Sequence, residues 1–263
     1  MPRGINRYQE AKSLRRLWTP EVWRGTNKLA AWWDFSNENG GLTVSTGLSN
    51  AVDLSGKGLT VSQGAGASQP PYSPTGWVGG GKPAIIPDGV ADGLDFSPGL
   101  SYNGTTGFSA ACIAYNSASG GRTIFSHWGG AGAPCLKLVG DTVELTRNFI
   151  AYLVQTPAGS CPAGVRILGC DLQSNSSVVW IDGVSYSTGT DPACVTPAVS
   201  LFNDNGQSLF GGGPFGEIMF GQSRWSIHER EIVDGYLAWK WGNVQNLAKS
   251  SNPYKNRPPL IGD

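Results

Sequence analysis

The chain has 263 residues, a formal net charge of zero, 38 glycines, 17 prolines and ten tryptophans, and only 14% of its residues are charged. This composition predicts many short strands joined by tight turns, and it excludes a helical bundle. No window approaches the roughly 18 apolar residues of a membrane span, so we expect no membrane partner. A chain of this length forms either one all-β domain or two smaller ones.

The first thirty residues are strongly basic. They hold seven Arg and Lys residues against two Glu, which gives this segment a net charge of about +5 and leaves the remainder at about −5. Such a segment either docks on a partner or forms a solvated, poorly ordered terminus. We interpret residues 1–28 as a docking arm, with a short helix around 8–17, and we do not expect nucleic acid as its partner. Its predicted contact residues are Arg3, Arg7, Arg15, Arg16, Trp18 and Trp23.

The N-terminus and the cysteines bear on the compartment. Residues 1–20 lack the apolar run of a signal peptide, which predicts synthesis and assembly in a cytoplasm. The spacing of the five cysteines matches no zinc motif, so we expect buried free thiols, with a Cys161–Cys170 bridge as the alternative. These cysteines are Cys112, Cys135, Cys161, Cys170 and Cys194.

The strands begin at Leu29–Phe35, where Trp32 and Asp34 are predicted to face one way and Trp33 and Phe35 the other. Residues 36–81 are turn-rich and polar, and we interpret them as a long ordered loop on the sandwich. Short apolar runs then recur from residue 108 to residue 225. Asp182-Gly183, between β-branched runs, predicts a two-residue type I′ hairpin, and Gly140-Asp141 predicts a second hairpin.

One helix is predicted from Ile227 to about Trp241. Ser226 and Glu229 form a capping-box pattern, apolar residues recur at helical spacing, and Gly242 stands where a C-terminal glycine cap belongs. The proline-rich segment 252–263 is predicted to be extended and to contact a neighbouring subunit.

The region from Val52 to Phe96 combines several turn signals, among them Asp53-Leu-Ser-Gly-Lys-Gly and Asp88-Gly-Val-Ala-Asp-Gly. Together with the stretch from Phe215 to Ser226 and the helix that follows, it resembles the LamG-like, concanavalin A-like lectin and glucanase jelly roll of bacteriophage virion proteins. The resemblance covers residues 29 to 243. It implies a two-sheet antiparallel jelly-roll sandwich with one C-terminal helix, spanning residues 29–248 between a basic arm and a C-terminal tail at 249–263.

Because the resemblance includes glucanases, we searched the strands for the paired carboxylates of a glycosidase. No strand carries two acidic residues that share a face, and Glu217 stands alone on its strand. His127 and His228, the only histidines, have no nucleophile and carboxylate nearby in the sequence. We therefore predict that the protein is not an enzyme.

Two binding sites are conceivable in the loops. Asp92 and Asp204 are candidate calcium ligands, although Asp in a tight turn more often binds its own backbone, and we otherwise expect no cofactor. An aromatic glycan platform is the second site, although such rings also plug the ends of a sandwich. Its candidate residues are Tyr72, Trp77, Tyr102 and Trp128.

These observations lead to one function and one alternative. We predict a structural accessory protein of a phage-like virion, decorating the capsid or the tail, that docks on other virion proteins through its arm and assembles as a homo-oligomer. The alternative is a carbohydrate-binding module that recognises host surface glycans.

Overall fold

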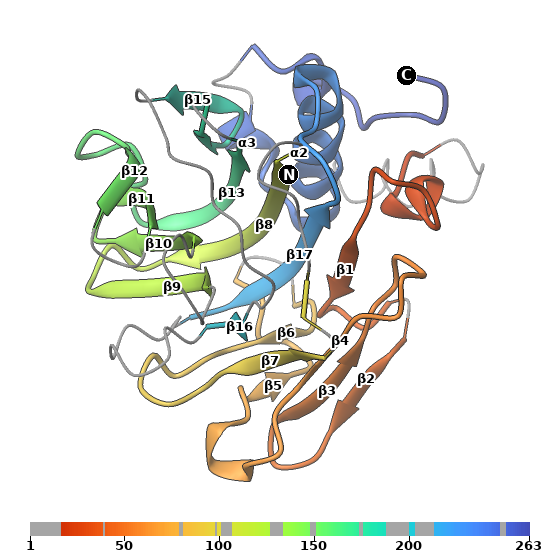
Figure 1. Cartoon of the computed structure of the whole chain (residues 1–263), viewed down its shortest axis with the longest axis vertical. Coiled ribbons are helices and arrows are strands. Elements are labelled where there is room, and N and C mark those ends of the chain that lie inside the picture. The colour runs from red at the N-terminus through yellow and green to blue at the C-terminus, as the bar shows by residue number, and fades with distance from the viewer. Residues whose placement is uncertain are drawn as a thin grey trace.

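The computed structural model describes residues 17–38, 40–78, 81–97, 99–100, 107–126, 134–147, 151–173, 176–187, 200–202, 213–247 and 251–263. Two antiparallel sheets lie face to face, and helix α2 (Ile227–Trp241) covers the outer face of one of them (Figure 1). The predicted all-β sandwich with a C-terminal helix is confirmed. Among the described residues, none of the helices combines the length and hydropathy that crossing a membrane requires.

The sheet beneath the helix is called the helix-side sheet. Its strands in spatial order are β15 (Val184–Ser187), β14 (Val178–Ile181), β13 (Gly164–Leu172), β8 (Phe108–Asn116), β17 (Phe215–Gly221), β6 (Ala84–Ile85) and β5 (Tyr72–Ser73), with β1 (Ala31–Asp34) also paired to β17. Both faces of its central strands, β8 and β17, are buried.

The second sheet packs on the other face of the helix-side sheet. Its strands in spatial order are β12 (Ala151–Gln155), β11 (Thr142–Arg147), β10 (Pro134–Val139), β9 (Gly121–Ser126), β16 (Ser200–Leu201), β7 (Leu94–Ser97), β4 (Thr60–Ser62), β3 (Leu48–Val52) and β2 (Leu42–Val44). The short helices are α3 (Val244–Leu247) and the 3-10 turns η1 (Pro20–Trp23), η2 (Gly66–Ser68) and η3 (Pro253–Lys255).

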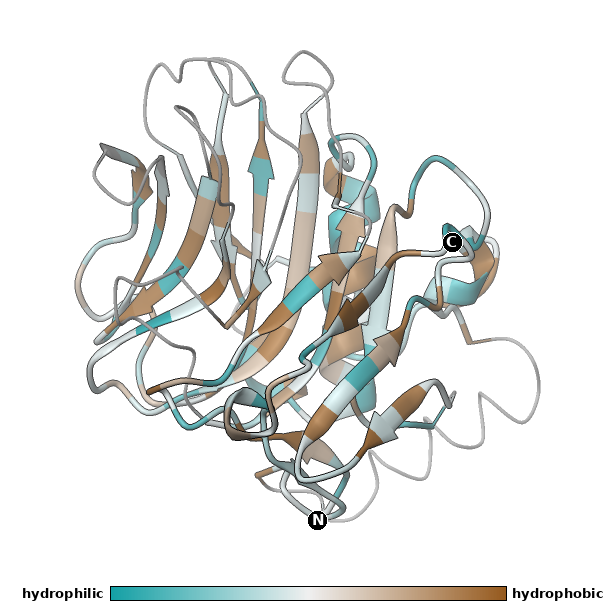
Figure 2. Cartoon of the chain, turned by 60° about the horizontal axis from the view of Figure 1, so that its bottom comes forward, coloured by the Kyte–Doolittle hydropathy of each residue, from teal (hydrophilic) through white to brown (hydrophobic). Residues whose placement is uncertain are grey.

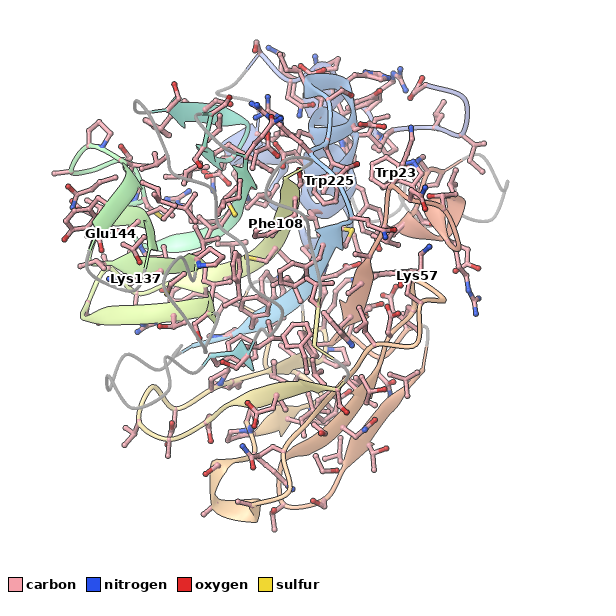
Figure 3. All side chains as sticks on the ribbon, in the orientation of Figure 1. Trp23, Lys57, Phe108, Lys137, Glu144 and Trp225 are labelled. Carbon is pink, nitrogen blue, oxygen red and sulfur yellow. The ribbon has the colours of Figure 1, made fainter. Side chains whose placement is uncertain are left out.

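Strand alternation produces two cores, one on each side of the helix-side sheet. Along β8, Cys112 lies in the core between the sheets, whereas Ile113 lies in the core under α2. Apolar and polar positions accordingly alternate in bands along the strands (Figure 2). In the second sheet, Leu136 points into the sandwich, while Lys137 pairs at 3.3 Å with Glu144 of the neighbouring strand (Figure 3).

Several local predictions are confirmed. Ser226 and Glu229 form the capping box, and Gly242 ends α2 in the left-handed conformation with φ of 77°. Asp182 and Gly183 have φ angles of 49° and 84° and join β14 to β15. The second hairpin, at Gly140-Asp141, joins β10 to β11.

Residues 36–81 do not form the predicted long loop. They contribute β2, β3 and β4 to the edge of the second sheet and β5 to the edge of the helix-side sheet. Leu48, Ala51 and Val61 from this region are buried in the core between the sheets. The prediction was wrong because these strands are only two to five residues long and are defined by backbone pairing, which a hydropathy pattern does not reveal.

The predicted terminal boundaries also change. Trp18 and Trp23 lie in the core under α2, and Leu17 forms a bridge with Leu260, so the folded body includes residues before Leu29. Trp23 lies beside Trp225, with the ring centroids 5.9 Å apart (Figure 3). The segment 251–263 is not an extended tail, since it buries Tyr254 against α2. The predicted helix at 8–17 lies outside the described residues, apart from Leu17.

A buried charge network attaches α2 to the helix-side sheet. Lys240 places its Nζ 2.8 Å from Asp34 Oδ2 and 2.8 Å from Glu217 Oε2, and it donates a third hydrogen bond to Tyr236. Asp34 and Glu217 are direct cross-strand neighbours on β1 and β17. The three charged side chains are at most 1% exposed, so water cannot replace any of these partners.

The two carboxyl groups respond differently to the single ammonium. Burial on its own would raise the pKa of Asp34, but the Lys240 charge and hydrogen bonds from Lys240 and Ser36 outweigh burial and hold it below its usual range. For Glu217, burial is the largest influence and raises the pKa above its usual range, although Lys240 acts in the opposite direction. The single charge of Lys240 thus stabilises two neighbouring carboxyl groups, and the ionisation of one affects the ionisation of the other.

We predict that Lys240→Met destabilises the protein by about 3–5 kcal/mol, because the substitution leaves two buried carboxyl groups without their cation. Urea denaturation monitored by tryptophan fluorescence measures the change. The matched control is Lys28→Met, which removes a half-exposed partner of Glu229 and should cost less than about 1 kcal/mol. Equal costs for the two variants would contradict the structural role of Lys240.

Candidate functional site

The structure contains a pair of neighbouring carboxylates that the sequence did not predict. No single strand was expected to carry two carboxyl groups on one face, but Asp34 and Glu217 become neighbours across two strands. Four donors surround the Glu217 carboxyl group: the indole N–H groups of Trp32 and Trp241, the Tyr236 hydroxyl and the Lys240 ammonium. A substrate cannot reach this pair, because both carboxyl side chains are fully buried. The pair is therefore structural.

The predicted arm residues do not form a surface in the described part of the chain. Trp18 stacks edge-on against Tyr236, and Trp23 contacts Trp18 and Trp225, so both rings belong to the core under α2. Burial therefore makes both rings unavailable to a docking partner. The four predicted arginines, Arg3, Arg7, Arg15 and Arg16, lie outside the described residues.

The predicted glycan platform is not assembled by the described residues. Trp77 is 3% exposed, and its indole N–H donates to the Trp241 carbonyl oxygen, so the ring plugs the core as the alternative interpretation held. Tyr72 is half-buried on β5, and Tyr102 and Trp128 lie outside the described residues.

The acidic turn around Asp92 uses its carboxyl groups internally. Asp92 accepts a hydrogen bond from the Asp88 backbone N–H, and Asp88 accepts bonds from the N–H groups of Val90 and Ala91. Within the described ranges, no three His, Cys, Asp or Glu side chains are grouped as metal ligands. Asp204, the other calcium candidate, lies outside those ranges.

An open groove of about 410 Å³ lies between the β14–β15 hairpin and the N-terminal half of α2, and we call it the hairpin groove. Its lining residues are Trp180, Gly183, Val184, Ser185, Ile227, Arg230, Glu231, Asp234 and Ser251. Val184 and Ile227 are 42% and 67% exposed, so the groove has apolar groups at its rim. The remaining side chains bring hydroxyl, carboxyl and guanidinium groups together.

Asp234 is the least exposed polar residue of the hairpin groove. It is 2% exposed, and its Oδ1 accepts a hydrogen bond of 3.0 Å from the indole N–H of Trp180. Burial raises the pKa of Asp234 to about 8, and the nearby Asp182 and Glu231 add to this effect, while the Trp180 bond and Arg230 oppose it. At neutral pH this residue is therefore an uncharged carboxylic acid.

Arg230 supplies the positive charge of the groove. Its guanidinium lies over the Trp180 ring, 5.1 Å from the centroid, and its Nη1 is 3.5 Å from Asp171 Oδ2. Neither Nε nor Nη1 has a hydrogen-bond partner among the described residues. Both atoms are buried, so a ligand in the groove is reached by the charge of Arg230 and not by these two N–H donors.

A smaller cavity of about 210 Å³ is also lined by Val184. Its charged groups are fully engaged: Arg166 donates to Asp182 and to the carbonyl oxygens of Pro162 and Ala163. Asp182 also accepts from the Ile167 N–H and from Asn243. This network holds the hairpin in place, so the hairpin groove is the stronger candidate for a binding site.

The hairpin groove was not predicted, although the sequence carries one signal of it. Asp234 follows Val233 and precedes Tyr236 and Leu237 on the apolar side of the predicted helix. An acidic residue inside such a stripe is costly unless it has a partner or a use. The partner, Trp180, is 54 positions away, and no helical or strand periodicity predicts that contact.

Comparisons with known proteins establish the fold alone. No protein-family model matches the chain, and no curated protein matches it in sequence. The binding domain of botulinum neurotoxin serotype D has a TM-score of 0.55 and 10% identity over 86% of this chain and 53% of that chain. Trypanosoma rangeli sialidase has a TM-score of 0.53 and 10% identity over 86% of this chain and 36% of that chain. The chain thus spans about half of the toxin domain and about a third of the sialidase.

We predict that Gly169→Ala destabilises the protein by about 1–3 kcal/mol and displaces Trp180. A Cβ at this position of β13 overlaps the Trp180 indole ring. Thermal unfolding and the near-ultraviolet circular dichroism of tryptophan measure both effects. Gly64→Ala is the matched control, since its Cβ meets no atom within 4 Å and its stability should change by less than about 1 kcal/mol. A Gly169→Ala variant as stable as the control would contradict this packing.

Proposed function

We propose that this chain is a non-catalytic recognition domain whose hairpin groove binds an uncharged carbohydrate. The observation that carries the proposal is the convergence of Arg230, Glu231, Asp234 and Ser185 on one open groove with apolar residues at its rim. Pockets that combine apolar contact surface with a few convergent polar groups are typical of small-molecule binding sites.

The charges of the groove favour a polyol over an ion. Arg230 and Glu231 carry opposite charges, and Asp234 is uncharged at neutral pH. A ligand with a single fixed charge is attracted by one of these groups and repelled by the other. Sugar hydroxyls donate and accept hydrogen bonds, so one neutral ring satisfies both kinds of group.

The fold supports the same proposal. A structure of this fold is described as the receptor binding domain of botulinum neurotoxin D, and part of Trypanosoma rangeli sialidase, studied in complex with 2,3-difluorosialic acid, also has it. Recognition of a ligand at a sandwich surface is a role that such a scaffold supports, because its core stays rigid while its edges bind.

Glycoside hydrolysis is the competing function, because Glu231 and Asp234 are two carboxyl groups in one groove. We favour binding on geometric grounds. Residues three positions apart on a helix project from the same side, whereas the two carboxyl groups of a glycosidase flank the scissile bond. In addition, one oxygen of Asp234 is already occupied by Trp180.

A glycan array with the full chain tests the proposal. We expect binding to an uncharged saccharide, with recovery of the saccharide uncleaved. Ser185→Trp fills the groove from the exposed strand β15 and should reduce binding at least tenfold, whereas Ser187→Trp, an exposed position on the same strand outside the groove, should leave binding within about twofold. Cleavage of the saccharide, equal effects of the two substitutions, or an array without a hit would contradict the proposal.

Attachment to a phage-like virion remains a prediction of the sequence. Its support is the family resemblance together with the five basic residues and one acidic residue among residues 1–16. Deletion of residues 1–16, which leaves Trp18 and Trp23 in place, tests it. The prediction requires that the shortened chain folds and no longer joins particles, and full incorporation would contradict a docking role of the arm.

A further inference from the structure

Asp234 differs from the buried acids that have a cationic partner. The Asp34, Asp171, Asp182 and Glu217 carboxyl groups each lie within 4 Å of a cationic side chain. Asp234 makes no ion pair with a described residue, and the only hydrogen bond of its carboxyl group there comes from Trp180. Its second oxygen, Oδ2, is left unpaired by the described residues at the wall of the hairpin groove. A buried polar group with unused bonding capacity in an open groove points to a ligand.

We propose that Asp234 contacts the ligand of the hairpin groove as an uncharged carboxylic acid whose O–H group donates a hydrogen bond to a ligand hydroxyl, and that binding therefore requires this proton. This inference rests on the proposed function of the groove. It makes Asp234 the residue that selects against cationic ligands, and it couples binding to pH.

The charged groups around Asp234 influence how readily its carboxyl group loses the proton. Asp182, at the β14–β15 turn, and Glu231, on α2, disfavour a further negative charge, while Arg230 favours it. The Arg230 charge is shared with Asp171, which also pairs with Arg224. With burial as the largest influence, the pKa of Asp234 is raised to about 8, so the acid stays protonated at neutral pH and loses its proton as the pH rises further.

The sign of the pH dependence separates the possible ligands. If only the protonated form binds, affinity is constant below the pKa and falls by about tenfold per pH unit above it. An amine or another cation would bind the ionised carboxylate instead, so its affinity would rise with pH over the same range.

Carbon-13 NMR of aspartate side-chain carboxyl groups in the full chain tests the protonation state without a ligand. The Asp234 signal is assigned by its loss in Asp234→Asn, which keeps the acceptor for Trp180. We expect this signal to titrate near pH 8. A midpoint below about pH 5 would overturn the inference whatever the groove binds.

The binding experiment uses the saccharide captured on the glycan array. Calorimetry measures its affinity between pH 6.5 and 9.5. We expect the affinity of the natural chain to fall at least tenfold, and the affinity of Asp234→Asn to stay within twofold, because the asparagine amide donates at every pH. Glu21→Gln, at an exposed position of η1, is the control and should keep the full pH dependence.

The outcomes separate this inference from the proposed function. A saccharide that binds with constant or rising affinity across this range overturns the role of the Asp234 proton and leaves carbohydrate binding intact. An array without a hit overturns the proposed function and, with it, the ligand contact of Asp234.

Discussion

Lys240 is buried together with two acids, and this arrangement constrains the rest of the fold. An ammonium group without access to water must find all its partners in the protein, and here they come from β1, β17 and α2 itself. The helix therefore cannot slide or rotate on the sheet without breaking several charged contacts at once. This fixed seating of α2 also determines where its first two turns, with Arg230, Glu231 and Asp234, meet the β14–β15 hairpin.

The position of the candidate site follows from the burial of both faces of the helix-side sheet at its central strands. One face packs on the second sheet, and the other packs on α2 and on the segments that contain Trp18 and Tyr254. Ligands therefore have to bind at edges and ends. The hairpin groove is lined by residues of β15, which is the edge strand of this sheet (Figure 1). The groove is larger than the neighbouring cavity, and one oxygen of its Asp234 carboxyl group has no partner among the described residues, whereas the charged groups of the cavity are fully engaged.

The sequence predicted the features whose physical causes are local. The capping box at Ser226, the glycine at 242 and the Asp182-Gly183 turn each depend on residues a few positions apart, and all three are confirmed. The network around Glu217 and the contact of Asp234 with Trp180 join distant segments, and they were not predicted because nothing local encodes them. The edge strands in 36–81 were missed for a different reason. β2, β3 and β4 pair with one another, but each has only three to five residues, which is too short to show a clear hydropathy period.

The pairing of β1 with β17 has a consequence for how the protein is made. Trp32 and Glu217 are 185 positions apart, yet they share a buried hydrogen bond. During synthesis, the early strand carries Trp32 and Trp33 without its partner until β17 has left the ribosome. Folding of a chain with such distant contacts is slow, because the connecting segment must first be ordered. The nascent chain therefore exposes tryptophan-rich segments that other chains or chaperones can bind before the native sheet closes.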